Sequence, residues 1–409
     1  MSHPASTELT LERVPMMGEA GRGKIKLIAL IGIVLVVVAV VLGLTTEDGK
    51  RHLSFAWLVG ATFVLSIGLG GMFFVLLQHL TRSGWSVVLR RIAENAMWTI
   101  PIAGLMFLPI VIPTVFGYSG LFPWIDAAWA EADPVVSKKT GYLNMPFFVA
   151  RYVFYFTVWI FMARYFRKAS LTQDQTRDPA ITTRLQSRAA PGMLVFALTA
   201  TFASFDFIMS LEPHWFSTIF GVYFFAGCTL SIYSTMILAA FFLSKNPDFG
   251  HLVTKEHYHD LGKWLFGFVF FWSYIAFSQF MLYWYANIPE ETEWLVHRQN
   301  HGWGYWSLVL IFGHCLIPFG GLLSRHVKRN KKVLSCWAVW LLLMQMVDLF
   351  WLIRPLMNSH GVHFGLIDVA TVFGLAFIGL AYGMQLTSKQ PLIAHGDPRL
   401  RESLELVVQ

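Results

Sequence analysis

Residues 27–44 read LIALIGIVLVVVAVVLGL, a run with no charged or hydrogen-bonding side chain. A helix that crosses the hydrocarbon core of a bilayer needs about 20 mostly apolar residues. In lipid, only a helix or a closed barrel satisfies all of its backbone hydrogen bonds, and a barrel strand would alternate apolar with polar residues. The run therefore predicts a membrane-spanning helix.

Nine further apolar blocks of this kind follow along the chain. Of its 409 residues, 56% are hydrophobic and 13% are charged, whereas a soluble domain carries about 25% charged residues. The sequence thus predicts an all-α, polytopic membrane protein of about ten transmembrane helices. The predicted spans are 27–44, 54–80, 88–113, 146–166, 190–211, 216–243, 262–288, 305–324, 333–354 and 366–386.

The basic residues predict the orientation of these spans. A net charge of +7 is also found in nucleic-acid-binding proteins, but here Lys and Arg lie in short loops between apolar blocks. Of 31 Lys and Arg residues, 24 fall on the side that holds both termini and 6 on the other, with Arg151 inside a predicted span. Positively charged loops stay in the cytoplasm. We therefore expect both termini to be cytoplasmic.

Two stretches of similar sequence suggest an internal repeat. Residues 206–213 read DFIMSLEP and residues 348–355 read DLFWLIRP, so each has an Asp, a charged residue six positions later and then Pro. Four predicted spans separate them, which is typical of a parallel repeat. We therefore predict two four-helix bundles with two peripheral helices. The predicted parts are a cytoplasmic tail at 1–26, a peripheral helix at 27–53, bundles at 54–211 and 216–355, a peripheral helix at 366–386, and a cytoplasmic tail at 387–409.

Ionisable side chains at membrane depth are the main candidates for function. Each costs about 2.5–3.5 kcal/mol to insert, so such residues face a bundle interior or a water-filled path. One hypothesis is a proton path built from two half-channels. The alternative is that the acids pair with Arg151 and Arg354 and only lock helices together. The candidates are Asp206, Asp348, Arg354, Glu94, Arg151, His314, Lys263, Tyr274, Ser273 and Asp368.

Cysteine and histidine spacing argues against a redox centre within this chain. The three cysteines have no paired spacing for haem attachment or a cluster. A haem between helices needs two axial ligands, and only His314 lies well inside a predicted span. His251, His257 and His259 precede the span 262–288 and are interpreted as a solvated loop instead of a metal site.

Aromatic residues gather near the predicted helix ends, where belts at the bilayer interface are expected. We interpret Trp85, Trp124, Trp294, Trp303 and Trp306 in this way. Two segments facing the periplasm are denser in polar and aromatic residues than a belt requires, so they predict a surface for a partner protein. Its candidate residues are Glu212, His214, Trp215, Tyr285, Asn287, Glu290 and Glu291.

The same two segments carry a family resemblance. Residues 206–221, DFIMSLEPHWFSTIFG, and 280–294, FMLYWYANIPEETEW, resemble the NrfD-like membrane subunits of bacterial alternative complex III. Of the two such subunits in that complex, the chain is more similar to the second. The resemblance extends over nearly the whole chain.

The resemblance implies a non-redox subunit of a quinol-oxidising respiratory complex in the inner membrane of a bacterium. Haem c and iron–sulfur clusters would belong to partner subunits: multihaem cytochromes c, a periplasmic iron–sulfur protein and a homologous ten-helix membrane subunit. It implies no cofactor bound by this chain, with quinone as a potential ligand. Asp206, Asp348 and Arg354 would inherit a proton path. The rival interpretations are a structural scaffold without transport and a free-standing secondary transporter.

Overall fold

The computed structural model describes residues 13–46, 48–357 and 361–406, and over these residues the chain forms helices and no strand. Ten helices are long and apolar enough to cross a membrane, which confirms the predicted all-α polytopic fold. The outer parts of both predicted tails, residues 1–12 and 407–409, lie outside the described residues.

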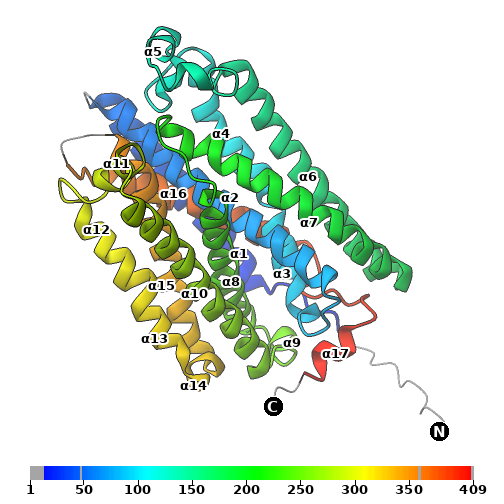
Figure 1. Cartoon of the computed structure of the whole chain (residues 1–409). Helices are drawn as coiled ribbons and strands as arrows, with labels where there is room; N and C mark the ends of the chain where they lie inside the picture. Colours follow the sequence, from blue (N-terminus) through cyan, green and yellow to red (C-terminus); the bar gives the residue numbers. More distant parts are fainter. Residues whose placement is uncertain (1–12, 47, 358–360, 407–409) are drawn as a thin grey trace.

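Each predicted span corresponds to one helix or to a pair of consecutive helices (Figure 1). In chain order these are α1 Glu19–Thr45, α2 Gly49–Leu80, α3 Val87–Met97 with α4 Ile100–Val115, α6 Met145–Thr176, α7 Pro179–Phe207, α8 Phe220–Leu243, α10 Lys255–Ala286, α12 Trp303–Leu310 with α13 Ile317–Leu323, α15 Lys331–Ile353 and α16 Leu366–Ser388. The short elements are η1 Pro123–Ile125, α5 Ala127–Ala132, η2 Ser137–Lys139, η3 Met209–Leu211, α9 Pro247–Gly250, α11 Pro289–His297, η4 Ile311–Leu316, α14 Arg325–Arg329, η5 Arg354–Leu356 and α17 Leu400–Leu404.

Several helices run beyond the apolar block that predicted them. The span predicted to end at residue 166 continues as α6 to Thr176, because hydropathy marks the membrane crossing and not the end of the helix. α6 stops at Arg177, which adopts a left-handed conformation with φ 53°. Asp178 then caps α7 by accepting the Ala180 amide, and Pro179 occupies its first turn.

Two spans are interrupted. Trp98 and Thr99 separate α3 from α4, where Pro101 lies at the second position of the new helix and has no amide to donate. The span predicted at 305–324 contains the six-residue π-helical segment η4 between α12 and α13. Such π segments are rare and are frequent at functional sites.

The spans form two rings of four that meet along α2 and α8. In the first ring α2, α4, α6 and α7 contact one another in turn, and in the second α8, α10, α12–α13 and α15 do so. α2 contacts both α8 and α15, and α1 and α16 form a pair that covers α2 (Figure 1). The arrangement agrees with the predicted two bundles and two peripheral helices.

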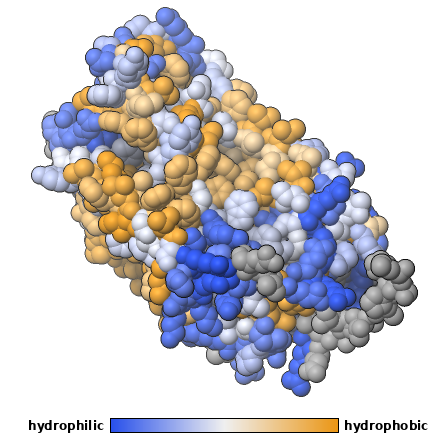
Figure 2. All heavy atoms as spheres, turned by 60° about the horizontal axis from the view of Figure 1, so that its bottom comes forward, coloured by the Kyte–Doolittle hydropathy of each residue, from blue (hydrophilic) through white to orange (hydrophobic). Residues whose placement is uncertain are grey.

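Both described termini lie at one end of the molecule, which we call the termini side; the other end is the far side (Figure 1). α9, α14 and α17 belong to the termini side, whereas α5 and α11 belong to the far side. Figure 2 shows hydrophilic residues gathered over the termini side and hydrophobic residues along the flank. Large apolar side chains on α1, α6 and α10 are exposed there, which is the surface that a bilayer covers.

Candidate functional site

Asp206, near the far-side end of α7, is held in a fixed ion pair. Arg151 of α6 donates from Nε to Oδ2 at 2.8 Å and from Nη2 to Oδ1 at 2.9 Å, and the Tyr155 hydroxyl donates to Oδ2 at 2.7 Å. Arg151 also donates to the Tyr142 backbone carbonyl at 2.9 Å, and its guanidinium carbon lies 3.9 Å from the centre of the Tyr142 ring. Both oxygens of the acid are thus bonded to neighbouring side chains, so the pair joins α6 to α7 as a lock.

Asp348 occupies the corresponding place near the end of α15 but has a different kind of partner. The hydroxyl of Tyr223 on α8 donates to Asp348 Oδ1. Both side chains are buried, and among the described residues no Lys, Arg or His forms an ion pair with Asp348. A carboxyl group bonded to a hydroxyl can accept or release a proton without an ion pair having to break.

Buried polar side chains continue from Asp348 toward the termini side. We call them the α8 polar line: Tyr223 and Ser231 of α8, Gln345 of α15 and Ser66 of α2. Tyr223, Gly227 and Ser231 lie four residues apart on α8 and so share one face. Gln345 of α15 packs against Gly227, where a Cβ would come within 2.6 Å of Gln345 Nε2. Ser66 of α2 donates to the Ser231 hydroxyl at 3.1 Å.

The α8 polar line also holds a buried atom without a protein partner. Gln345 is buried, and its Oε1 makes no hydrogen bond with a group of the described residues. Buried polar atoms of this kind are unusual, because leaving one unsatisfied costs about 1–3 kcal/mol. The line therefore has spare hydrogen-bonding capacity inside the protein, unlike the Asp206 lock.

Sequence reasoning missed the residues of the α8 polar line. A signal is present in Tyr223 and Ser231, which lie eight residues apart and so share one face of α8, but Thr229, Tyr233, Ser234 and Thr235 lie in the same block. It is weak because neutral polar residues are common in spanning helices, where they do not stand out as ionisable residues do.

His314 lies in the π-helical segment η4, fully buried in the second ring. Its ring stacks on Trp272 at 4.0 Å between centroids, and Trp272 in turn lies 5.7 Å from the Tyr223 ring. Neither ring nitrogen of His314 has a hydrogen-bond partner among the described residues. The structure thus connects His314 to Asp348 through two aromatic rings.

Arg354 does not pair with Asp348, contrary to one of the predicted pairings. Its Nε lies 3.2 Å from Asp368 Oδ1, and its Nη2 donates to the His363 carbonyl at 2.6 Å. His52 Nε2 lies 2.8 Å from Asp368 Oδ2. The six-residue step from Asp348 turns Arg354 away from that carboxyl group. Arg354 therefore ties the end of α15 to α16 and α2.

Glu212 was predicted to contact a partner protein, but it is buried in an ion cluster on the far side. His297 Nδ1 lies 3.1 Å and Arg298 Nη1 lies 3.7 Å from its carboxylate oxygens. Hydrogen bonding to Glu212 raises the pKa of His297. Burial lowers the pKa of Arg298 to about 10, although the Glu212 charge acts in the opposite sense. Arg298 also donates to the Leu352 carbonyl at 2.8 Å.

The rest of the predicted partner surface divides into buried and exposed residues. Trp215 is only 4% exposed and stacks on Trp294 at 4.4 Å, so its prediction as a contact residue is wrong for this chain. His214 lies at the surface and pairs with Asp133 at 2.7 Å. Tyr285 is 85% exposed. The remaining candidates lie beside it at the start of α11: Asn287 and Glu290, which are exposed, and Glu291, which is half-buried.

The belt interpretation also fails for three tryptophans. Trp124, Trp294 and Trp303 are each buried inside the protein. Trp124 donates its ring N–H to the Ser210 carbonyl at 3.0 Å. Helix ends near the interface also pack against one another, and the large rings fill those contacts.

Glu94 belongs to a buried charge cluster on the termini side. Arg90 Nε and Arg91 Nη1 donate to its carboxylate at 3.2 and 2.7 Å. Arg91 also bonds Asp174 of α6, and Arg90 Nη1 donates to Asp397 at 2.7 Å. We call these five residues the termini-side charge cluster. Its ion pairs join α3 to α6 and to the C-terminal segment.

The C-terminal segment contributes Asp397 to this cluster. Burial opposes ionisation of Asp397, but the charges of Arg90 and Arg399 and hydrogen bonds outweigh it and lower the Asp397 pKa to about 2. Ser403 donates to the Trp85 carbonyl at 2.6 Å, and His257 Nε2 lies 3.2 Å from the same hydroxyl. The described part of the predicted tail is therefore packed against the bundle.

Three other candidates lie away from any interior path. Tyr274 is 58% exposed on the outer face of α10, so its prediction as an internal relay is wrong. Ser273 donates to the Val269 carbonyl at 2.7 Å, within its own helix. Lys263 lies at the surface and pairs with Asp260 at 2.5 Å.

His257 and His259 also correct an expectation, because both are buried in α10 and not in a solvated loop. Within the described ranges, no three His, Cys, Asp or Glu side chains are placed to hold a metal ion together. No protein-family model and no curated protein matches the chain. The function of the chain is therefore inferred from its own residues and from the sequence resemblance.

Proposed function

We propose that the chain is an integral membrane subunit of a quinol-oxidising respiratory complex of the alternative complex III type. In this proposal it resides in the inner membrane of a bacterium, with the termini side in the cytoplasm. It anchors the complex and contributes a proton path coupled to quinol oxidation in a neighbouring subunit. The redox groups, haem c and iron–sulfur clusters, belong to the partners. The family resemblance and the asymmetry of basic residues support this proposal.

The observation that carries the proton path is the environment of Asp348. It is a buried acid at membrane depth whose partner is the Tyr223 hydroxyl, and Gln345 and Ser231 follow toward the termini side. Buried acids in spanning helices are expensive and mark ion or proton pathways when no structural pair explains them. Hydroxyl groups both donate and accept hydrogen bonds, and in this proposal water between Tyr223 and Ser231, which are not bonded to each other, carries the proton from one to the other.

Asp206 has the other role in this proposal. Two parallel hydrogen bonds from Arg151 and one from Tyr155 hold its carboxylate in place. An Arg–carboxylate fork is among the strongest side-chain pairs and resists rearrangement. We therefore place the path in the second ring alone and treat the first ring as an anchor.

A structural scaffold without transport is the second candidate, and one observation favours it. The ion pairs of the termini-side charge cluster join α3, α6 and the C-terminal segment. A chain that only joined other subunits would need this kind of lock and no path.

Charge-neutralising variants distinguish the two candidates. In vesicles that hold the assembled complex, Asp348→Asn is expected to lower the number of protons moved per electron while the complex still assembles. Asp206→Asn, the matched control at the equivalent place, is expected to reduce assembly but not the proton-to-electron ratio of the complex that remains. An unchanged ratio in Asp348→Asn would favour the scaffold.

A further inference from the structure

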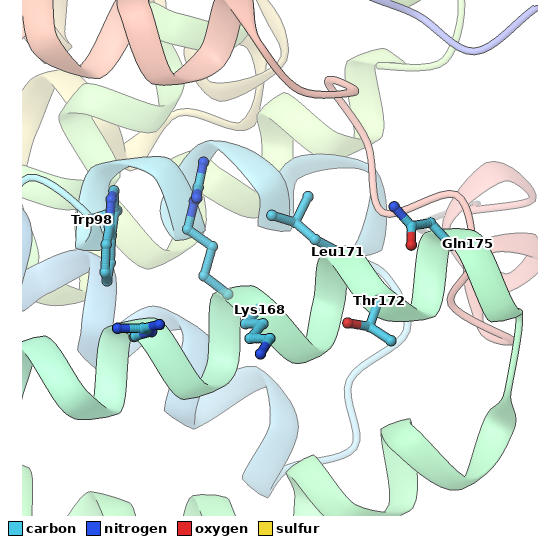
Figure 3. A pocket seen from close by; sticks show the side chains of 7 residues that line it. Trp98, Lys168, Leu171, Thr172 and Gln175 are labelled. Carbon is cyan, nitrogen blue, oxygen red and sulfur yellow. The ribbon is translucent and has the colours of Figure 1, made fainter.

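A basic hollow of about 250 Å³ lies on the termini side of α6. Figure 3 shows Trp98, at the break between α3 and α4, facing the α6 side chains across this hollow. Arg164, Arg167 and Lys168 bring three positive charges to it. Its remaining lining residues are Leu171, Thr172 and Gln175.

The positive charges of the hollow are not neutralised by the protein. Arg164 and Lys168 are exposed, and neither forms an ion pair with any described residue. Arg167 is oriented by Asn95, whose Oδ1 accepts from its Nε at 3.3 Å and from its Nη2 at 3.2 Å. Glu94 is the acid near Arg167, but it is already bonded by two other arginines. The hollow is thus suited to an anion.

The surface beside the hollow is apolar. Phe154, Phe161 and Lys168 follow one another at intervals of seven residues, so they lie along one face of α6. Phe154 is 55% and Phe161 is 70% exposed. α4, which packs against α6, exposes Leu105 and Ile112. An exposed aromatic and aliphatic flank thus leads from membrane depth to the cationic end.

We infer that this hollow binds the phosphate headgroup of an anionic diacyl phospholipid. The phosphate would lie between Arg164 and Lys168, within reach of Arg167, and the acyl chains would lie along Phe161 and Phe154. Basic pockets between spanning helices recognise anionic headgroups, and arginine matches phosphate geometry. Trp98 lines the same hollow, and tryptophan is a residue that packs well at the level of lipid headgroups. Lipid binding here does not depend on the proposed proton path.

The test measures binding of phosphatidylglycerol and phosphatidylcholine with identical acyl chains to the purified, delipidated full-length chain in detergent by native mass spectrometry. The wild-type chain is expected to bind phosphatidylglycerol more tightly. The variant Arg164→Gln/Lys168→Gln is expected to lose about 30-fold in affinity for it, from about 1 kcal/mol for each basic residue near the surface. Arg167 is kept because it also bonds Asn95.

Arg184→Gln/Arg188→Gln is the matched control. It removes two exposed charges with the same four-residue spacing from α7, outside the hollow, and should leave the affinity unchanged. If the first variant does not fold, Lys168→Gln alone is expected to lose about fivefold. Equal losses in the variant and the control, or no preference of the wild-type chain, would overturn the inference. Displacement by an equal concentration of glycerol phosphate would overturn the assignment to a lipid.

Discussion

Asp206 and Asp348 lie at matching places in the two rings, yet their surroundings differ. Asp206 accepts hydrogen bonds from Arg151 and Tyr155. Asp348 instead accepts one from the Tyr223 hydroxyl, which belongs to the α8 polar line. Because both acids are buried to the same degree, the nature of the partner and not the depth distinguishes them. The comparison shows that one sequence pattern can place an acid in an ion pair in one ring and against a neutral hydroxyl in the other.

The largest expected effect comes from breaking the ion pair between Arg151 and Asp206. Arg151→Gln leaves the Asp206 carboxylate buried without its cation, and breaking a buried ion pair on one side costs about 3–5 kcal/mol. We expect a strong loss of folded protein, measured as yield and as the melting temperature in detergent.

A double variant sharpens that comparison. Arg151→Leu/Asp206→Leu removes both charges, and a buried pair replaced by apolar residues is often tolerated. We expect it to recover much of the lost stability. A double variant as unstable as Arg151→Gln would mean that the pair is not a simple lock.

Asp397→Asn tests a second lock of the same kind, in the termini-side charge cluster. The variant leaves Arg90 with a weaker partner at a cost of about 1–3 kcal/mol, so the C-terminal segment should detach more often. We expect faster proteolysis of that segment at pH 7. Glu405→Gln, an exposed residue of the same segment, is the control and should not change the rate.

The low pKa of Asp397 also predicts a pH dependence. Its pKa is about 2 in the folded chain, below the value of about 3.9 for an unperturbed Asp. The stabilisation is therefore present above about pH 4 and is lost as the pH falls toward 2. Proteolysis of the wild-type segment should accelerate over that range, and the Asp397→Asn variant should lack this dependence.

Tyr223→Phe probes the other side of the comparison. It removes the hydroxyl that bonds Asp348 and should cost about 0.5–1.5 kcal/mol, much less than opening the Asp206 lock. If Tyr223 belongs to the path, the variant complex should also move fewer protons per electron. Tyr155→Phe is its counterpart in the first ring, and there the proton-to-electron ratio should be unchanged.

The smallest effect is expected at His297, which pairs with Glu212. The hydrogen bond to Glu212 raises the His297 pKa, so the pair stabilises the fold below about pH 6.5, the value of an unperturbed His. This contribution disappears as the pH rises through the raised pKa. We expect a partly exposed pair to contribute a few tenths of a kcal/mol. Melting temperatures of wild type and His297→Gln should differ at pH 5.5 and agree at pH 8.5.

The ten spans and the depths of Asp206 and Asp348 could be predicted because hydropathy records both directly. The contacts of the acids could not, since they depend on how each helix is rotated within its ring. Tyr274 illustrates the problem: beyond the charged first turns of α10, large apolar residues lie on all sides of the helix, so periodicity does not separate its lipid face from its interior face. The packing of the C-terminal segment against the bundle could not be predicted from the sequence, because charged residues such as Asp397 surround its short apolar run.

We propose that Asp348 exchanges a proton during turnover and that Asp206 does not. Infrared difference spectroscopy of the assembled complex, before and after quinol addition, records carboxyl groups that change protonation. We expect a carboxyl band that shifts in heavy water, disappears in Asp348→Asn and persists in Asp206→Asn. A band that persists in Asp348→Asn, or that is lost only in Asp206→Asn, would contradict it.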